Sequence, residues 1–249
     1  MTRGVFVTGT DTGVGKTLIA GSLLRSLCTS GMRAIGMKPV AAGIDSGAAM
    51  NTDVAALIAA ANVAAPATDI NPYSFALPVA PHLASKAAGV GIELERIADA
   101  YARLAALAEA IVVEGAGGVL VPLGTQTDML DIPARLDLPV LLVVGIRLGC
   151  LNHALLSALA IASRGLRLAG WVANRIEPEM PAADGNVTTL RERLPAPLIA
   201  DVPWCERGER AVQFDAAALR VLGFEEGLRR GDRDRSSAFA AKRARLPLP

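Results

Sequence analysis

Short aliphatic runs alternate along this chain with longer segments in which apolar residues recur at helical spacing. Runs of this length, bounded by glycine, proline or polar residues, are typical of buried strands. Strands joined by helical segments form βαβ units, which indicates a mainly parallel sheet. The segments that we expect to be strands are Val5–Thr8, Ala34–Lys38, Ile111–Glu114, Val140–Val144, Ala169–Asn174 and Leu198–Val202.

The segments between these runs carry helix signals. Leu18–Ser30 precedes Gly31 and Asn152–Arg164 precedes Gly165, and glycine is the residue that most often ends a helix. Apolar residues recur every three or four positions from Leu94 to Ala108, which predicts an amphipathic helix there. Ligands of such α/β proteins bind at the carboxyl ends of the strands, so polar residues at these ends are candidates for function.

The composition agrees with one α/β domain. The chain has 249 residues, a net charge of +1 and three scattered cysteines, which we interpret as reduced thiols of a cytoplasmic protein. The longest aliphatic run, Leu138–Ile146, is too short to span a bilayer. We therefore expect neither a membrane nor a nucleic acid as a partner, because no strong field would attract either.

The most specific motif lies in residues 9–17, Gly-Thr-Asp-Thr-Gly-Val-Gly-Lys-Thr, directly after the first expected strand. Its glycines allow backbone N–H groups to converge on a phosphate, at the start of a helix. Lys16 can reach the outer phosphates, and the Thr17 hydroxyl can bind Mg²⁺. The usual motif has four residues between its first glycine and the Gly-Lys pair, whereas this chain has five. A glycine-rich turn with an incidental lysine is the alternative interpretation. The context of strand, loop and helix favours a single-domain P-loop NTPase-like fold, a mainly parallel sheet flanked by helices.

Three further residues stand where ligands of this loop would be bound. Lys38 ends a strand before a proline, and it is either a surface lysine or a cation for a phosphoryl group. Glu114 ends a buried strand before Gly115, and it could pair with an arginine or bind Mg²⁺. Asp53 starts an alanine-rich segment, where it could complement a helix N-terminus or complete the metal shell.

Taken together, these blocks resemble those of the dethiobiotin synthetase family over residues 5 to about 204. The resemblance includes the five-residue spacing of the loop and several short motifs in the same order. These motifs are Lys38-Pro39-Val40, Asn51-Thr52-Asp53, Asn71-Pro72-Tyr73, Val113–Gly118, Leu148–His153, Gly170–Asn174 and Val202-Pro203-Trp204.

The resemblance implies an ATP- and Mg²⁺-dependent reaction. An amine of 7,8-diaminononanoate takes up CO₂ as a carbamate, and ATP phosphorylates a carbamate oxygen. The second amine then closes the ring to dethiobiotin, with ADP and phosphate as the other products. Lys38 would contact the carbamate and the γ-phosphate, and Lys16 the β- and γ-phosphates, as the catalytic residues.

The resemblance also implies a set of binding residues. Thr17, Asp53 and Glu114 would hold Mg²⁺. Asn174 would hydrogen-bond the adenine, and the backbone of residues 203–205 would line the base pocket. The residues expected to contact the nucleotide and its metal are Gly13, Val14, Gly15, Lys16, Thr17, Leu18, Asp53, Glu114, Gly115, Ala116, Gly117, Asn174, Pro203, Trp204 and Cys205. Those expected to contact the substrate are Thr12, Lys38, Ala42, Gly149, Cys150 and Asn152.

For the segment from Gly149 to His153, the resemblance implies a role in the active site of a partner subunit. The N–H groups at this helix start would bind the carboxylate of the substrate held mainly by the partner, in a twofold dimer with composite active sites. His153 could otherwise be a general base or a packed capping residue. His82 shows no partner in the sequence, and we expect it to be structural.

The chain departs from the family pattern in two places. Position 42 often carries a serine in this family, but here it is Ala42, and loss of one hydroxyl contact would weaken substrate binding by roughly 1 kcal/mol. Residues beyond about 224 exceed the usual family length. We therefore expect residues 1–224 to form the domain and residues 225–249 a disordered, solvated extension, with an anionic partner for its basic residues as the alternative.

Other functions are compatible with a phosphate loop. A nucleotide-switch ATPase that partitions DNA or positions proteins commonly has a second lysine within the loop, where this chain has Asp11 and Thr12. An ATP-dependent amide-forming enzyme usually carries a glutamine-hydrolysing domain, for which this chain has no room. A catalytically silent binding module would not need the charged residues at the strand ends.

Overall fold

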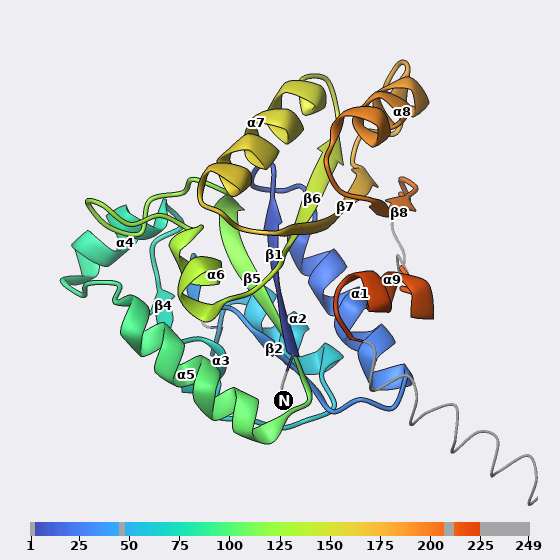
Figure 1. Cartoon of the computed structure of the whole chain (residues 1–249). Coiled ribbons are helices and arrows are strands. Elements are labelled where there is room, and N and C mark those ends of the chain that lie inside the picture. The colour runs from blue at the N-terminus through green and yellow to red at the C-terminus, as the bar shows by residue number, and fades with distance from the viewer. Residues whose placement is uncertain (1–2, 45–47, 207–211, 225–249) are drawn as a thin grey trace, which may run out of the picture.

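Six parallel strands form the central sheet of the protein (Figure 1). The structure is a computed structural model that describes residues 3–44, 48–206 and 212–224. The strand order is β2-β5-β1-β6-β7-β8, with every neighbouring pair parallel. The strands are β1 (Arg3–Gly9), β2 (Ala34–Met37), β5 (Ala110–Gly118), β6 (Val140–Ile146), β7 (Leu168–Arg175) and β8 (Leu198–Val202).

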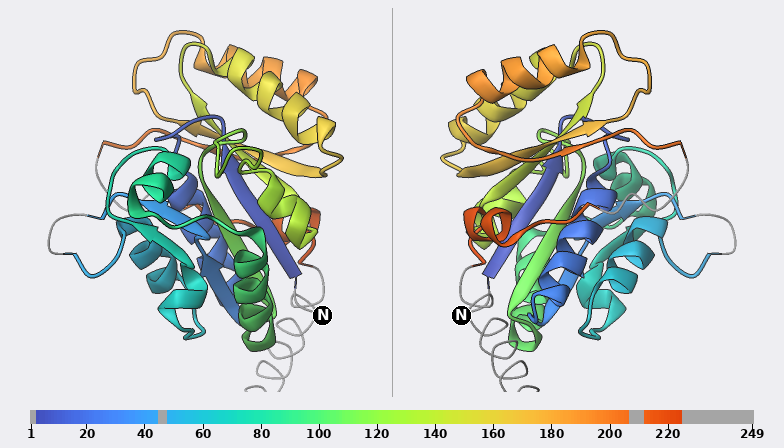
Figure 2. Two further views of the ribbon diagram at one scale, coloured as in Figure 1. Left: turned by 90° about the vertical axis from the view of Figure 1, so that its left-hand side faces the viewer. Right: turned by 90° about the vertical axis from the view of Figure 1, so that its right-hand side faces the viewer.

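Helices cover both faces of this sheet (Figure 2). Side chains alternate along each strand, so that Val5 and Val7 enter one apolar core while Phe6 enters another on the opposite face. The first core is closed by α1 (Lys16–Thr29), α2 (Thr52–Ala60) and α9 (Ala216–Val221). The opposite face is closed by α3 (Ala67–Ile70), α4 (Pro81–Ala88), α5 (Leu94–Leu107), α6 (Asp131–Leu136), α7 (Cys150–Ser163) and α8 (Ala183–Arg193). Every helix therefore buries an apolar side against the sheet or its extension.

The six expected strands and the mainly parallel, single-domain P-loop NTPase-like fold are confirmed. The expected helices are confirmed too, although α1 and α7 each begin two residues before the expected start. Gly31 and Gly165, which follow these helices, have φ values of +88° and +67°. Glycine adopts this left-handed backbone without the steric cost that other residues meet, and this explains the two helix ends.

A second, two-stranded parallel sheet was not expected from the sequence. It consists of β3 (Val40–Ala42) and β4 (Tyr73–Phe75), and it lies next to the end of β2. Pro39 ends β2 because it has no N–H group to continue the pairing. A three-residue strand leaves too short an apolar run for its periodicity to be read.

The parallel arrangement brings the carboxyl ends of the strands to one edge of the sheet. Within the described residues, no helix is both long and apolar enough to cross a membrane. The prediction that residues 225–249 are a disordered extension lies outside the part of the chain that the structure describes.

Candidate active site

The phosphate loop joins the end of β1 to the start of α1, as the motif predicted. Gly13 and Gly15 have φ values of +76° and +93°, which only glycine adopts readily. A Cβ atom on Gly15 would also lie 2.3 Å from Asn174 Nδ2. The same Nδ2 donates a 2.7 Å hydrogen bond to the Val14 carbonyl, so that the end of β7 supports the loop from behind.

Lys16 is the first residue of α1 and is only 7% exposed. Its ammonium donates to the Asp11 carbonyl at 2.8 Å. Burial, reinforced by the positive charge of Lys38, lowers the pKa of Lys16 to about 8. A phosphate bound next to Lys16 would therefore raise this pKa and favour the protonated ammonium.

Asp11 connects the loop to the end of β6. One carboxylate oxygen accepts from the N–H of Thr12 at 2.7 Å, and the other accepts from Arg147 Nη2 at 2.5 Å. Arg147 directly follows β6 and precedes the turn that opens α7. The sequence interpretation gave Asp11 and Arg147 no such role, and no local signal indicated that residues 136 positions apart would pair.

Lys38 lies between two carboxylates at the carboxyl end of the sheet. Its Nζ atom is 2.6 Å from Asp53 Oδ2 and 2.6 Å from Glu114 Oε1, and the Thr17 hydroxyl donates to the same Glu114 oxygen at 2.8 Å. Lys38 is 4% exposed and Glu114 is fully buried. Lys38 is thus not a surface lysine, and the cationic partner of Glu114 is this lysine rather than an arginine.

Lys38 and Asp53 stabilise each other's charged form, whereas burial raises the pKa of Glu114 above its ordinary value. Burial alone would lower the pKa of Lys38, but Glu114 and Asp53 outweigh it and hold that pKa above its ordinary value. Burial likewise opposes ionisation of Asp53, yet Lys38 keeps the pKa of Asp53 below its ordinary value. The lysine is therefore charged and Asp53 is ionised at neutral pH.

Asp53 reaches this cluster from the first turn of α2. The Asn51 side chain caps that helix by accepting the Asp53 N–H at 3.0 Å, so capping does not require the Asp53 carboxylate. Asn51 Nδ2 also donates to the Gly43 carbonyl at 2.7 Å, which fixes the helix start against the segment after β3. Of the two interpretations of Asp53, the geometry favours the one that places it in the site.

The oxygen atoms of Thr17, Asp53 and Glu114 fit a magnesium ion. In the part of the chain that the structure describes, Glu114 Oε2 is buried and accepts no hydrogen bond. A buried carboxylate oxygen without a hydrogen bond carries a free-energy cost, which a bound cation would offset. Among the described residues, no three His, Cys, Asp or Glu side chains form a metal-binding group. Mg²⁺ does not need one, because it commonly uses one or two carboxylates together with phosphate oxygens and water.

A cavity of about 710 Å³ opens in front of these charged groups. Its lining includes the charged or hydroxyl-bearing side chains of Lys16, Thr17, Lys38, Asp53 and Glu114. The other lining residues are Thr12, Gly13, Gly15, Ala41, Ala42, Asn51, Pro78, Val79, Ala80, Pro81, Ala116, Gly117 and Val121. Residues 78–81 also line this cavity, and the sequence interpretation gave them no role in it.

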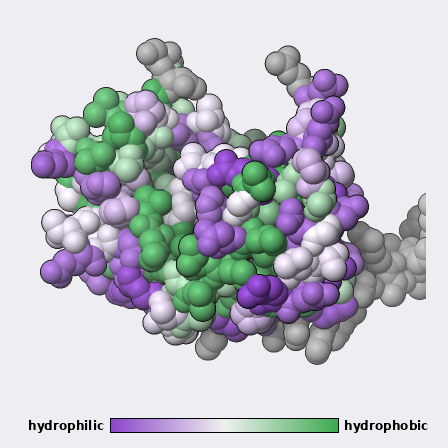
Figure 3. Space-filling model, turned by 90° about the horizontal axis from the view of Figure 1, so that it is seen from above, coloured by the Kyte–Doolittle hydropathy of each residue, from purple (hydrophilic) through white to green (hydrophobic). Residues whose placement is uncertain are grey.

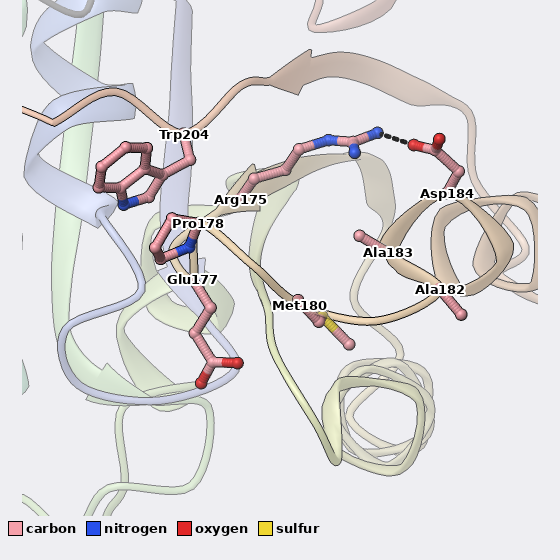
Figure 4. Close-up of a pocket in the computed structure, with 8 residues that line it drawn as sticks. All are labelled: Arg175, Glu177, Pro178, Met180, Ala182, Ala183, Asp184 and Trp204. Carbon is pink, nitrogen blue, oxygen red and sulfur yellow. Dashed lines mark ion pairs between the residues drawn. The ribbon is translucent and has the colours of Figure 1, made fainter.

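Several expected nucleotide-binding residues lie outside this cavity. Val14 is fully buried, Leu18 is half-buried at the start of α1, and Gly115 packs against Phe6 and Met129. Trp204 lines a separate pocket of about 440 Å³. Its two neighbours in the sequence, Pro203 and Cys205, are exposed. Figure 4 shows Trp204 and Pro178 on one side of this pocket, and the ion pair of Arg175 and Asp184, 2.6 Å long, on the other.

The expected substrate residues divide into two groups. Thr12, Lys38 and Ala42 line the 710 Å³ cavity, whereas Gly149, Cys150 and Asn152 lie at the start of α7 and do not. Gly149 has a φ of +92° and directly precedes the helix. If Gly149, Cys150 and Asn152 contact the substrate, they must therefore do so outside the 710 Å³ cavity of their own chain.

The fold and the phosphate loop define the class: a P-loop NTPase-like protein. A family model described as an AAA domain matches residues 3–211. Two solved structures are similar over most of the chain. The septum site-determining protein MinD from Pyrococcus horikoshii has a TM-score of 0.53 at 14% identity, covering 96% of this chain and 98% of that one. A ParA family ATPase from Chlorobium tepidum has a TM-score of 0.51 at 15% identity, covering 92% and 91%. At such low identity, these likenesses concern the fold alone.

Closer relatives specify the family. The ATP-dependent dethiobiotin synthetase BioD of Nitrosospira multiformis is 50% identical over 82% of this chain and 89% of its own. The protein of the same name from Aromatoleum aromaticum is 48% identical over 89% of this chain and 98% of its own. The chain belongs to the dethiobiotin synthetase family of ATP-dependent ligases. The expected family is thus confirmed, and the switch ATPases share only the fold.

Proposed function

We propose that this protein closes the ureido ring of dethiobiotin from 7,8-diaminononanoate, CO₂ and ATP, through a carbamate and a carbamic-phosphoric anhydride. The observation that carries the proposal is the position of Lys38. Its charged ammonium lies between Asp53 and Glu114 and lines the same cavity as Lys16 of the phosphate loop. Lys16 and Lys38 thus share a cavity with apolar residues such as Val79 and Val121, which suits a substrate with both an anionic head and an alkyl chain.

The chemistry requires cations because it brings two anions together. A carbamate oxygen attacks the γ-phosphorus, ADP leaves, and the second amine then attacks the carbamoyl carbon and expels phosphate. Lys16 would hold the β- and γ-phosphates, while Lys38 would neutralise the carbamate and the transferring phosphoryl group. Thr12 and Ala42, which line the cavity, would lie beside the carbamate and the alkyl chain.

Thr17, Asp53 and Glu114 would hold the magnesium ion. A bound Mg²⁺ supplies charge neutralisation for the phosphates and helps to hold them in line. Lys38 contacts both carboxylates of this set, so its ammonium would have to share or exchange these contacts when nucleotide is bound.

The nucleobase site of the proposal involves the end of β7 and the segment after β8. Asn174 would contact the adenine, and the backbone of Pro203, Trp204 and Cys205 would line the base pocket. The support is that Asn174 adjoins the phosphate loop through Val14 and that Trp204 lies in a pocket with the next residue, Arg175.

A twofold homodimer would complete each active site. Leu148 is 90% exposed immediately before the α7 turn, and Leu156 and Leu159 of α7 are 57% and 67% exposed. Figure 3, which views the end of the molecule that carries α7 and α8, shows apolar surface gathered there. Such exposed leucines are typical of protein interfaces. Burying them against a second copy would bring the Gly149, Cys150 and Asn152 turn to the substrate carboxylate of the partner.

Phosphate release from Mg-ATP tests this function. It should depend on both diaminononanoate and bicarbonate, and product analysis should find dethiobiotin. A Lys38→Ala variant should bind nucleotide but lose ring closure. ATP turnover indifferent to both substrates would exclude the synthetase function, and full activity of Lys38→Ala would remove Lys38 from its role.

A further inference from the structure

Lys38 sits where the chain leaves the central sheet. It follows β2 and precedes Pro39, so the strand pairing that fixes Met37 does not extend to it. Both backbone polar groups of Lys38 are instead bound by one neighbouring segment. The Lys38 N–H donates to the Ile70 carbonyl at 2.8 Å, and the Lys38 carbonyl accepts from Asn71 Nδ2 at 2.6 Å.

The Asn71 amide also connects this point to the small second sheet. The same Nδ2 atom donates to the Tyr73 carbonyl at 3.0 Å, while the Tyr73 N–H donates to the Pro39 carbonyl at 3.1 Å. Val40 and Tyr73 are the first paired residues of β3 and β4. Asn71 therefore bridges the start of β4 and the backbone of Lys38, the residue whose side chain we propose as the catalytic cation.

The segment that holds Lys38 is itself anchored to α5. The Tyr73 hydroxyl accepts the Glu93 N–H at 2.9 Å, and the Arg96 guanidinium lies 4.6 Å from the centre of the Tyr73 ring. Arg96 also donates to the Pro72 carbonyl at 2.7 Å. These contacts attach the segment to α5 through Tyr73 and Pro72, whereas the contact with Lys38 itself is made by Asn71.

We infer that Asn71 is a positioning residue for Lys38, acting through the Lys38 carbonyl. The inference rests on the proposed function, which makes Lys38 the cation for the carbamate and the γ-phosphate. The amide donates from one nitrogen to two carbonyls, which neither an alanine nor an ionised aspartate can do. Without this donor the backbone at residue 38 can shift, and a small displacement of a catalytic group strongly slows a reaction that depends on alignment.

The matched variants are Asn71→Ala, which removes the donor, Asn71→Asp, which keeps the shape but not the donor, and Asn71→Ser, which can donate to one carbonyl only. Tyr73→Phe is the control, because it removes a hydrogen bond of the same segment that does not involve Lys38. For each variant we would measure three things. These are the melting temperature, the affinity for a non-hydrolysable ATP analogue by calorimetry, and the kcat and KM of substrate-dependent phosphate release.

Asn71→Ala and Asn71→Asp should lower kcat about tenfold or more, with nucleotide affinity within about twofold of wild type. Asn71→Ser should be intermediate, and Tyr73→Phe should keep kcat within about twofold even if its melting temperature falls. In a Lys38→Arg background, where the ammonium is already replaced, Asn71→Ala should have a much smaller effect on kcat. This non-additivity is not expected of a residue that only stabilises the fold.

Two results would overturn the inference: an unchanged kcat in Asn71→Ala and Asn71→Asp, or the same loss of kcat in the wild-type and Lys38→Arg backgrounds. If Asn71→Ala does not fold, Asn71→Ser carries the same test. A failure of the proposed function is distinguishable, because wild-type ATP turnover would then be indifferent to diamine and bicarbonate.

Discussion

The Thr17 hydroxyl donates to the Glu114 carboxylate at 2.8 Å, although the two residues are 97 positions apart. The contact follows from the topology. β1 pairs with β5 so that Val7 lies opposite Glu114, and the loop after β1 then returns Thr17 to the end of β5. A hydroxyl and a buried carboxylate side by side, next to the phosphate loop, form the part of the site that we assign to the metal.

Glu114→Gln should abolish most of the metal-dependent activity. The variant keeps the side-chain shape but removes the charge, and it leaves Lys38 with Asp53 as its remaining anionic contact in the cluster. We expect kcat/KM for Mg-ATP to fall roughly 100-fold or more, because groups that hold charge in a buried site commonly contribute this much. A magnesium titration of activity should also require higher concentrations. The control is Glu95→Gln, which changes an exposed glutamate paired with Arg135, and wild-type behaviour of Glu114→Gln would contradict the assignment.

Gly15→Ala should weaken nucleotide binding by about tenfold or more. Its methyl group would meet Asn174 Nδ2 at 2.3 Å on a backbone with a φ of +93°. Gly31→Ala separates the two effects, because its φ is +88° but nothing lies within 4 Å of the added carbon. Both variants should lose about 1 to 2 kcal/mol of stability through the left-handed backbone. Only Gly15→Ala should lose affinity for an ATP analogue in calorimetry, and equal affinity of the two variants would refute this account of the loop.

Nucleotide affinity should decrease as the pH rises above about 8. The pKa of Lys16 is lowered to about 8 by burial and by Lys38 when no phosphate is bound. Bound phosphates stabilise the protonated lysine, so above this pH binding must take up a proton, and the dissociation constant should rise by up to about tenfold per pH unit. Calorimetry of an ATP analogue from pH 7 to roughly 10 measures this dependence. Lys16→Gln should bind weakly and without the dependence, whereas a flat wild-type profile would mean that Lys16 is not the group that titrates.

Leu159→Glu should convert a dimer to a monomer. A charge on this 67% exposed leucine of α7 would have to be buried in the proposed interface, where an unpaired charge is costly. Light scattering after size-exclusion chromatography gives the mass directly. Leu107→Glu, on α5, is a matched change at another exposed leucine and should leave the mass unaltered. A monomeric wild-type protein would remove the composite active site from the proposal.

The sequence predicted the central sheet well because its inner strands are buried on both faces, as β6 is along its whole length. Val140–Val144 is a continuous aliphatic run, and Ala169–Asn174 is apolar up to its last residue. The structure extends the first run by two residues at its carboxyl end and the second by one residue at each end. The strands β3 and β4 were missed because three residues carry no readable period. Their pairing depends on contacts between residues more than 30 positions apart, such as Val40 with Tyr73.

The candidate site was predictable to the extent that single residues carried a local signal. Lys38 and Glu114 stand at the ends of aliphatic runs, which suggested a functional position without their partners. The pairing of Lys38 with Asp53, and that of Asp11 with Arg147, depends on which strands are neighbours in the sheet. A periodic pattern contains no information on that order. The link from Asn71 to Lys38 was invisible for the same reason, although the motif around Asn71 was noted.

The most direct test of the proposed reaction follows the oxygen atom that attacks the γ-phosphorus. If the carbamate is phosphorylated, one of its oxygens leaves with the released phosphate when the ring closes. A single turnover started with ¹⁸O-labelled CO₂, quenched before the label exchanges with water, should yield ¹⁸O in inorganic phosphate together with dethiobiotin. Dethiobiotin formed with unlabelled phosphate, under conditions in which the remaining CO₂ is still labelled, would contradict the account.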